Sequence, residues 1–257
     1  MKEKLSEIIN KLVDFLKKHK KQAIIIGSAS AVVLALIIGC AVYANDYYHA
    51  DEEAISALVG HSSSIDIYEL QNGVTVCEPT VARAGFIFYP GGKVECSAYL
   101  PLMESLAARG ILTVLIEMPL NLAVLDVNAA DGISESFPEI DSWYIGGHSL
   151  GGSMAASYLT KNQDEIDGLV LLGSYSTADI KDSRVLSVYG ENDGVMNREK
   201  YDKYKSNLPE DLDEFVIKGG NHAYFGIYGE QDGDGKATIT QIEQIVITAD
   251  LISQFIK

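Results

Sequence analysis

Residues 147–151 read Gly-His-Ser-Leu-Gly, and this G-x-S-x-G pattern constrains the fold more than any other part of the chain. It follows an apolar, strand-like run at 143–145 and precedes an Ala-rich segment typical of a helix. A serine at such a turn adopts a strained backbone conformation, and the flanking glycines allow neighbouring backbone to approach closely. The helix that follows directs its free N–H groups at developing negative charge. The pattern therefore predicts Ser149 as a nucleophile on a strand-turn-helix junction.

A serine nucleophile needs a base, and the five histidines leave one good candidate. Three of them lie at or before position 61, ahead of the first expected strand of a catalytic domain. His148 adjoins the serine on a tight turn, so its side chain should point away from the hydroxyl. His222 lies in a Gly-rich loop after the strand-like residues 214–217. We therefore predict His222 as the base.

The third catalytic member should be a carboxylate at the end of a strand between the serine and the histidine. Residues 184–190 form a β-branched, strand-like run that ends in glycine, and Asp193 follows in a turn-forming sequence. Asp179, after the preceding strand-like run, is the alternative acid. The chain order is then Ser149, Asp193, His222, which is one of three well-known orders for such triads.

These motifs resemble those of the α/β-hydrolase superfamily. The resemblance covers roughly residues 73–257 and lies in the lidless branch that includes dienelactone-hydrolase-like esterases, and in particular a group of bacterial envelope hydrolases. It implies an α/β-hydrolase fold and the triad named above, and it strengthens the prediction of His222. The segments that carry it are 88–94, 146–152, 190–194 and 221–235.

The same resemblance implies an oxyanion hole built from two backbone N–H groups. One donor is Leu150, the residue after the nucleophile. The other should come from the turn after the strand-like run 84–89, where Pro90 is followed by two glycines. We predict Gly92 as this second donor, with Lys93 as the next candidate.

Strand-like and helical segments alternate through residues 67–257, which predicts an α/β domain with a mostly parallel sheet and helices on both faces. Only about a dozen residues separate the strand-like run ending near Leu172 from the next one. We therefore expect no cap domain and a shallow, open active site. Thr240 and Glu243 have capping-box spacing, so a last helix should begin there and continue to about Phe255.

The acidic stretch 230–235 invites comparison with a calcium-binding loop, because two aspartates alternate with glycines. Neither possible frame supplies the full ligand set, since one lacks the required glycine and the other ends in Gln241. An acidic turn leading into the last helix explains the pattern better. We predict neither a metal ion nor a cofactor.

Residues 1–22 carry seven lysines against three acidic residues, and residues 23–44 follow without a charge. The uncharged stretch is long enough to cross a bilayer, and the positive-inside rule leaves the basic segment in the cytoplasm. We therefore predict a signal-anchor transmembrane helix over 23–44, a spacer over 45–66 and an extracytoplasmic domain over 67–257.

Cys40 ends a sequence that matches a bacterial lipobox, so a cleaved lipoprotein is the alternative to an uncleaved anchor. The apolar residues that continue to Ala44 favour the anchor. Cys77 and Cys96 could form a disulfide outside the cytoplasm, or serve as small buried residues.

Residues 23–257 hold 13 basic and 33 acidic residues, so the exported part should repel nucleic acid and anionic polymers. The predicted substrate is a small-molecule or envelope-linked ester. The function that fits is a membrane-anchored serine hydrolase, most simply a carboxylesterase that forms an acyl-enzyme. A non-catalytic binding module of the same fold, and an acyltransferase with the same triad, are the alternatives.

Overall fold

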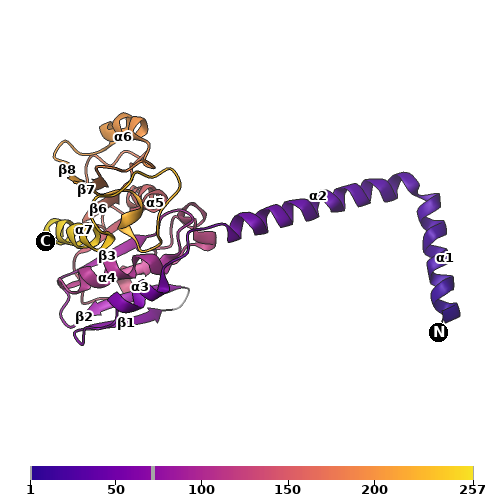
Figure 1. Ribbon diagram of the computed structural model, residues 1–257, viewed down its shortest axis with the longest axis horizontal. Helices are drawn as coiled ribbons and strands as arrows, with labels where there is room; N and C mark the ends of the chain where they lie inside the picture. The colour runs from indigo at the N-terminus through magenta and orange to yellow at the C-terminus, as the bar shows by residue number, and fades with distance from the viewer. Residues whose placement is uncertain (1, 71–72, 257) are drawn as a thin grey trace. The chain divides into compact units, whose positions relative to one another are not determined.

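The computed structural model describes residues 2–70 and 73–256, and the chain divides into two compact units, Met1–Asp46 and Tyr47–Lys257. The first unit consists of two helices, α1 (Lys2–Lys18) and α2 (Lys20–Asn45) (Figure 1). The helix predicted over 23–44 therefore exists, within α2. None of the described helices combines the length and the apolar character that crossing a bilayer requires. The membrane-spanning role assigned to 23–44 is not confirmed and stays a prediction.

The second unit is built on one eight-stranded sheet with the order β1-β2-β4-β3-β5-β6-β7-β8. Strand β2 runs antiparallel to both of its neighbours. The other strands after it in this order, β4, β3, β5, β6, β7 and β8, are parallel to one another. This confirms the predicted mostly parallel sheet. The strands are β1 (Ile65–Leu70), β2 (Val74–Pro79), β3 (Ala84–Tyr89), β4 (Ile111–Ile116), β5 (Trp143–His148), β6 (Gly168–Leu172), β7 (Arg184–Gly190) and β8 (Asp213–Ile217).

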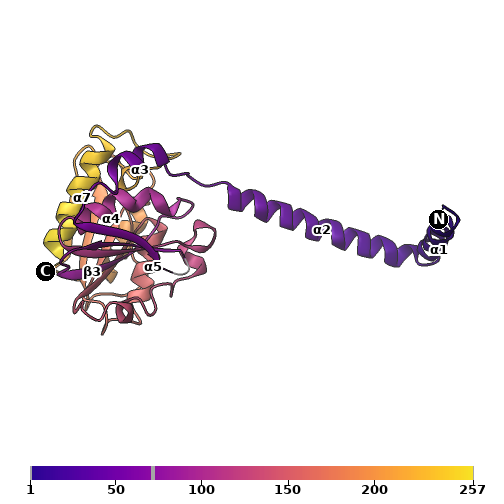
Figure 2. The same cartoon turned by 90° about the horizontal axis from the view of Figure 1, so that it is seen from below.

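Helices cover both faces of this sheet (Figure 2). Helices α3, α4 and α7 contribute buried side chains to the core on one face, and α5 contributes to the core on the other. The helices of this unit are α3 (Glu52–Leu58), α4 (Leu100–Ala107), α5 (Leu150–Leu159), α6 (Arg198–Tyr204) and α7 (Gln241–Phe255). Short 3₁₀ helices lie at Cys96–Tyr99, Pro119–Asn121, Ala123–Leu125, Ser134–Ser136, Lys205–Asn207 and Ala223–Phe225.

Strand β3 shows why the central strands read as continuous apolar runs. Phe86 and Phe88 point into the core beneath α4 and α7, whereas Ile87 and Tyr89 point into the core beneath α5. All four side chains are buried. Because successive side chains of a strand face opposite sides, a sheet covered on both faces needs apolar residues at every position.

The compact domain begins earlier than predicted, because residues from Tyr47 onward belong to it rather than to a spacer over 45–66. The Tyr48 N–H donates to the Lys93 carbonyl at 2.7 Å, and the Asp51 N–H donates to the Ile227 carbonyl at 2.9 Å. Ile55 of α3 is buried in the main core. These contacts involve residues far away in the chain, so the local sequence did not reveal them.

The connection between β6 and β7 holds no helix or strand, as the spacing predicted, and covers residues 173–183. The longer connection is 117–142, between β4 and β5, which carries three of the 3₁₀ helices. Helix α7 begins with the predicted capping box. The Thr240 side chain accepts from the Glu243 N–H, and the Glu243 carboxylate accepts from the Thr240 N–H.

Candidate functional site

Ser149 lies at the turn between β5 and α5, in a backbone conformation that L-residues rarely adopt. Its φ is 53° and its ψ is −119°. Two hydrogen bonds hold this strained residue: its N–H donates to the Leu172 carbonyl at 2.9 Å, and its carbonyl accepts from the Ser174 hydroxyl at 2.7 Å. Both partners belong to the end of β6 or the residues just after it. The neighbouring strand therefore stabilises a conformation that the serine would not adopt alone.

The flanking glycines are required by packing rather than by their own dihedral angles. A Cβ on Gly147 would lie 2.6 Å from the Gly151 carbonyl carbon and the same distance from the Tyr89 carbonyl oxygen. A Cβ on Gly151 would collide with the carbonyl oxygens of Tyr89 and Pro90. The start of α5 therefore packs backbone to backbone against the end of β3. This is the close approach that the G-x-S-x-G pattern predicted.

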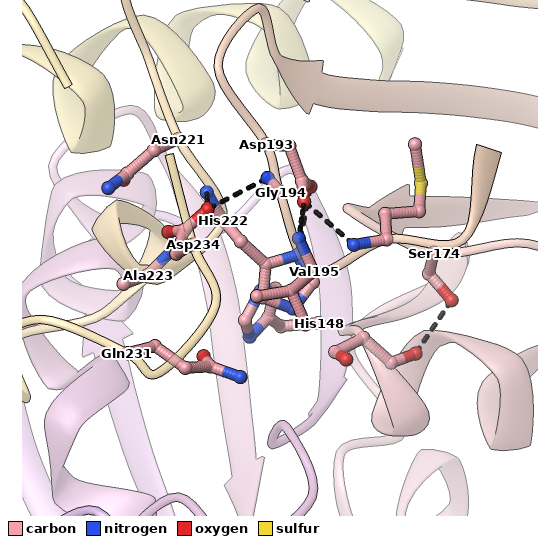
Figure 3. Close-up of polar contacts among 12 residues, drawn as sticks. His148, Ser174, Asp193, Gly194, Val195, Asn221, His222, Ala223, Gln231 and Asp234 are labelled. Carbon is pink, nitrogen blue, oxygen red and sulfur yellow. Dashed lines mark hydrogen bonds and ion pairs between the residues drawn. The ribbon is translucent and has the colours of Figure 1, made fainter. Parts of the chain in front are cut away.

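His222 and Asp193 form a buried pair (Figure 3). His222 Nδ1 lies 2.8 Å from Asp193 Oδ2, and the two side chains are 1% and 0% exposed. Because the carboxylate only accepts, Nδ1 carries the proton and donates it. In a neutral imidazole the other nitrogen, Nε2, then keeps a free lone pair. That Nε2 is buried and has no hydrogen-bond partner among the described residues.

The structure pairs His222 with Asp193 and not with Asp179, the alternative acid. Asp179 is exposed and forms a surface ion pair with Lys181 at 3.2 Å, which lowers the pKa of its carboxyl. The second oxygen of Asp193 accepts from two backbone N–H groups, those of Val195 at 3.0 Å and Met196 at 2.8 Å. Both oxygens of Asp193 are thus fixed in place.

Two residues near Ser149, Gly173 and His148, contact the Asp193–His222 pair. Gly173 follows the carbonyl that binds the Ser149 N–H, and a Cβ on it would lie 2.9 Å from His222 Nδ1 and 3.1 Å from Asp193 Oδ2. His148, the residue before Ser149, stacks at a tilt on His222 with the ring centroids 4.4 Å apart. The three predicted triad members thus follow β5, β7 and β8, at the carboxyl ends of parallel strands of one sheet, and His222 Nε2 forms no hydrogen bond with Ser149 in this structure.

His148 is buried and is part of a hydrogen-bond chain with Tyr99 and Gly91. The Tyr99 hydroxyl accepts from the Gly91 N–H at 3.1 Å and lies 2.8 Å from His148 Nδ1. Which of the two atoms donates in the Tyr99–His148 bond depends on the tautomer of His148. Burial, with a smaller contribution from His222, holds the pKa of His148 well below its usual value, which keeps the ring neutral. Sequence reasoning missed Tyr99, because no local motif marks it.

Among the described residues, Gly92 is the one in the loop after β3 whose backbone N–H has no acceptor. The Gly91 N–H donates to Tyr99, and the Lys93 N–H donates to the Asn121 carbonyl at 2.8 Å. Gly92 has no such acceptor among the described residues, and a Cβ on it would lie 2.9 Å from the Leu150 side chain. Leu150 is the first residue of α5, so its N–H has no acceptor within the helix. Gly92 therefore lies against the Leu150 side chain, whereas the Lys93 N–H is already engaged.

Backbone strain is concentrated around this site. Four described non-glycine residues have positive φ: Lys93 at 60°, Leu120 at 53°, Asn121 at 54° and Ser149 at 53°. All four lie in the connections that follow β3, β4 and β5. Strained conformations persist where the surrounding structure imposes them, and they cluster at functional sites. The four residues therefore mark the carboxyl edge of the sheet as the place of the candidate site.

The acidic turn at 230–235 does not present its carboxylates as a calcium loop would. Asp234 accepts hydrogen bonds from four backbone N–H groups, so its lone pairs face protein donors. Within residues 2–70 and 73–256, no group of three or more His, Cys, Asp or Glu side chains is arranged to hold a metal ion. Cys77 and Cys96 are free thiols, the first buried and the second partly buried.

Comparison with protein families decides the classification. A model described as alpha/beta hydrolase family matches residues 85–246, more than half of the chain. The chain belongs to the alpha/beta hydrolase family. The matched region holds β3 to β8, the turn at Ser149 and the Asp193–His222 pair. No curated protein matches the sequence significantly.

Solved structures share the fold at low sequence identity. TT1662 from Thermus thermophilus is 14% identical with a TM-score of 0.54, over 75% of this chain and 98% of that one. A dienelactone hydrolase from Anabaena variabilis is 15% identical with a TM-score of 0.54, over 75% and 97%. Est1E from Butyrivibrio proteoclasticus is 13% identical with a TM-score of 0.51, over 76% and 99%. These likenesses support the fold.

The Tyr99 hydrogen-bond chain yields a stability prediction. Tyr99→Phe keeps the buried ring but leaves the Gly91 N–H and His148 Nδ1 without their partner, so the free energy of unfolding should fall by about 1–3 kcal/mol. Urea unfolding of purified protein measures it. Tyr204→Phe, a change on a half-buried ring stacked on Tyr175, is the control and should stay within about 0.5 kcal/mol. Equal stability of Tyr99→Phe and the unmodified protein would contradict the assigned hydrogen bonds.

Proposed function

We propose that this protein is a serine hydrolase that cleaves carboxylic esters through an acyl-enzyme. The observation that carries the proposal is the buried Asp193–His222 pair, whose free Nε2 lies at the same sheet edge as the strained Ser149. A buried imidazole lone pair without a partner costs stability, and a catalytic role is one explanation for such a group in a native structure. Proton transfer from a serine hydroxyl is the use that this arrangement supports.

The chemistry follows the order of the groups. His222 Nε2 takes the Ser149 hydroxyl proton as Oγ bonds to the ester carbonyl carbon, and the carbonyl oxygen becomes an oxyanion. The N–H groups of Gly92 and Leu150 bind that oxyanion. His222 then gives the proton to the alcohol oxygen as the bond between that oxygen and the carbonyl carbon breaks. A water molecule, deprotonated by His222 in the same way, releases the acyl group from Ser149.

Asp193 has an orienting role in this scheme. Its Oδ2 holds the Nδ1–H of His222, which fixes the tautomer with its lone pair on Nε2 and stabilises the imidazolium formed in each step. The backbone N–H groups that bind Oδ1 prevent the carboxylate from turning away. The resemblance to a dienelactone hydrolase structure supports ester chemistry, and the acidic composition favours an uncharged substrate.

Loss of the nucleophile should abolish turnover. Ser149→Ala should leave the fold intact and lower kcat on p-nitrophenyl esters by about 10³-fold or more, because no acyl-enzyme can form. A fluorophosphonate probe should label the unmodified protein and not the variant. Ser174→Ala, a change at the residue that binds the Ser149 carbonyl, should still be labelled.

Near-normal hydrolysis by Ser149→Ala would refute the proposed nucleophile. No labelling of the unmodified protein would favour the binding-module alternative. Faster release of p-nitrophenol with added alcohols, together with formation of their esters, would favour acyl transfer. Esters of increasing acyl length, measured in the same assay, define the substrate range.

A second comparison separates the two acid candidates. Asp193→Asn should lower kcat by about 10²–10⁴-fold, because the amide favours the wrong tautomer of His222. Asp179→Asn should change kcat by less than about twofold, because that side chain is exposed and pairs with Lys181. Steady-state kinetics on one ester are sufficient. The opposite ranking would move the acid to the connection after β6.

We also propose, on the sequence alone, that residues 23–44 anchor the protein in the cytoplasmic membrane with its catalytic domain outside. The charge-free stretch behind seven lysines supports this orientation. Lipidation at Cys40 after cleavage is the alternative, and it too would leave the domain tethered outside the cytoplasm.

The state of the N-terminus distinguishes the two tethers. With an uncleaved anchor, the intact mass of the membrane-extracted protein should match the full chain, and Cys40→Ser should change nothing. With lipidation, the mature chain should begin at Cys40 and incorporate labelled fatty acid. The Cys40→Ser variant should then show neither the cleavage nor the label. Recovery of full-length protein in the soluble fraction alone would contradict both.

A further inference from the structure

Asp234 is the most heavily hydrogen-bonded carboxylate at the edge of the site (Figure 3). Its Oδ1 accepts from the N–H groups of Gly194 at 3.0 Å, His222 at 3.2 Å and Gly235 at 2.8 Å. Its Oδ2 accepts from the Ala223 N–H at 2.8 Å. All four donors are backbone groups, so this carboxylate binds the main chain and no side chain.

The donors belong to two different loops, which follow β7 and β8. Gly194 follows Asp193 in the loop after β7, whereas His222 and Ala223 belong to the loop after β8. Asp234 bonds both at once. A Cβ on Gly194 would lie 2.6 Å from the Gly233 carbonyl oxygen, so the acidic turn also packs directly on the loop after β7.

These are the loops that must be in register for the acid to meet the base. Asp193 and His222 are 29 residues apart, and their 2.8 Å hydrogen bond depends on the relative position of the two loops. The loop after β8 is also supported by the buried Gln244 of α7. Its side chain accepts from the Asn221 N–H at 3.0 Å and donates to the Asn221 carbonyl at 2.8 Å.

Two other bonds also join the loops after β7 and β8: the Asn192 N–H donates to the Gly220 carbonyl at 2.8 Å, and the Gly219 N–H donates to the Glu191 carboxylate at 2.9 Å. Asp234 differs from them because it binds the residue after Asp193 and His222 itself.

We propose that Asp234 is a positioning residue that fixes the Asp193–His222 pair by bridging the two loops through its carboxylate. The inference rests on the proposed function, because it assigns that pair its purpose. Asp234 touches no reacting atom in this scheme. It acts by holding the backbone N–H groups of residues 194 and 222–223 on one anion.

An amide cannot replace this carboxylate. In Asp234→Asn the NH₂ group takes the place of either Oδ1 or Oδ2, and in both orientations it faces backbone N–H donors. At least one donor then loses its acceptor, and the NH₂ group has none in its place. Asp234→Glu is the second variant, since it keeps the charge and shifts the carboxylate by one methylene.

The kinetic experiment compares Asp234→Asn with Asp232→Asn, an exposed aspartate of the same turn. Asp234→Asn should lower kcat on a p-nitrophenyl ester by about 10²-fold, with KM changed by less than about threefold, since the catalytic pair is displaced while the substrate surface is kept. Asp232→Asn should match the unmodified protein. Thermal melting establishes that each variant is folded, and Asp234→Glu takes the place of Asp234→Asn in every comparison if the latter does not fold.

A double-mutant comparison separates positioning from general destabilisation. If Asp234 acts through the pair, adding Asp234→Asn to Asp193→Asn should lower kcat by only about threefold or less, because the interaction that it aligns is already lost. A merely structural role would multiply the two effects. Full multiplication, or an unchanged kcat in Asp234→Asn, would overturn the proposal.

A substrate-free measurement keeps the inference separate from the proposed function. The His222 Nδ1 proton shared with Asp193 should give a downfield proton NMR signal, which His222→Gln assigns by removing it. Asp234→Asn should abolish or broaden that signal, and Asp232→Asn should retain it. Retention in Asp234→Asn would overturn the positioning role even if the ester assay fails. Failure of Ser149 to react with the fluorophosphonate probe would instead count against the proposed function.

Discussion

The backbone contact between the start of α5 and the end of β3 is the constraint on which the rest of the site depends. Gly151 packs so closely on the carbonyls of Tyr89 and Pro90 that no side chain fits between them. This contact fixes the start of α5 beside the loop after β3, where the Leu150 side chain meets Gly92. Ser149 occupies the turn just before α5, with φ of 53°. The Leu172 carbonyl, which accepts from the Ser149 N–H, and the Ser174 hydroxyl, which donates to the Ser149 carbonyl, then stabilise that strained conformation.

Two aspartates at the same edge illustrate how one type of side chain takes two tasks. Asp193 gives one oxygen to backbone N–H groups and the other to His222, so its position and its partner are both fixed. Asp234 gives both oxygens to backbone N–H groups alone. Charge-assisted bonds to backbone are among the stronger hydrogen bonds in proteins, which makes a carboxylate well suited to cross-linking loops. The same acidic turn that resembled a metal site in the sequence is explained by this geometry.

Much of the fold was predictable, because the signals were local. Fully apolar runs identified the central strands, since both faces of the sheet are covered, and the Thr240–Glu243 pair marked the start of α7. The prediction of a spacer over 45–66 was wrong, because the contacts that attach this segment to the domain come from distant parts of the chain. Tyr48 and Asp51 bind the carbonyls of Lys93 and Ile227, which lie far away in the chain. A short segment held by such bonds has no periodic pattern that the sequence could reveal.

The sequence by itself determined the strand-turn-helix junction at Ser149 and reduced the base to His222, because a spaced glycine motif and a small number of histidines are properties of the chain. It left the acid open between Asp193 and Asp179 and the second oxyanion donor open between Gly92 and Lys93. Only the tertiary structure placed Asp193 at 2.8 Å from His222 and engaged the Lys93 N–H with Asn121. The roles of Tyr99 and Asp234 also emerged only there. Each depends on which loops meet at the edge of the sheet, and that is settled by strand order and packing rather than by neighbouring residues.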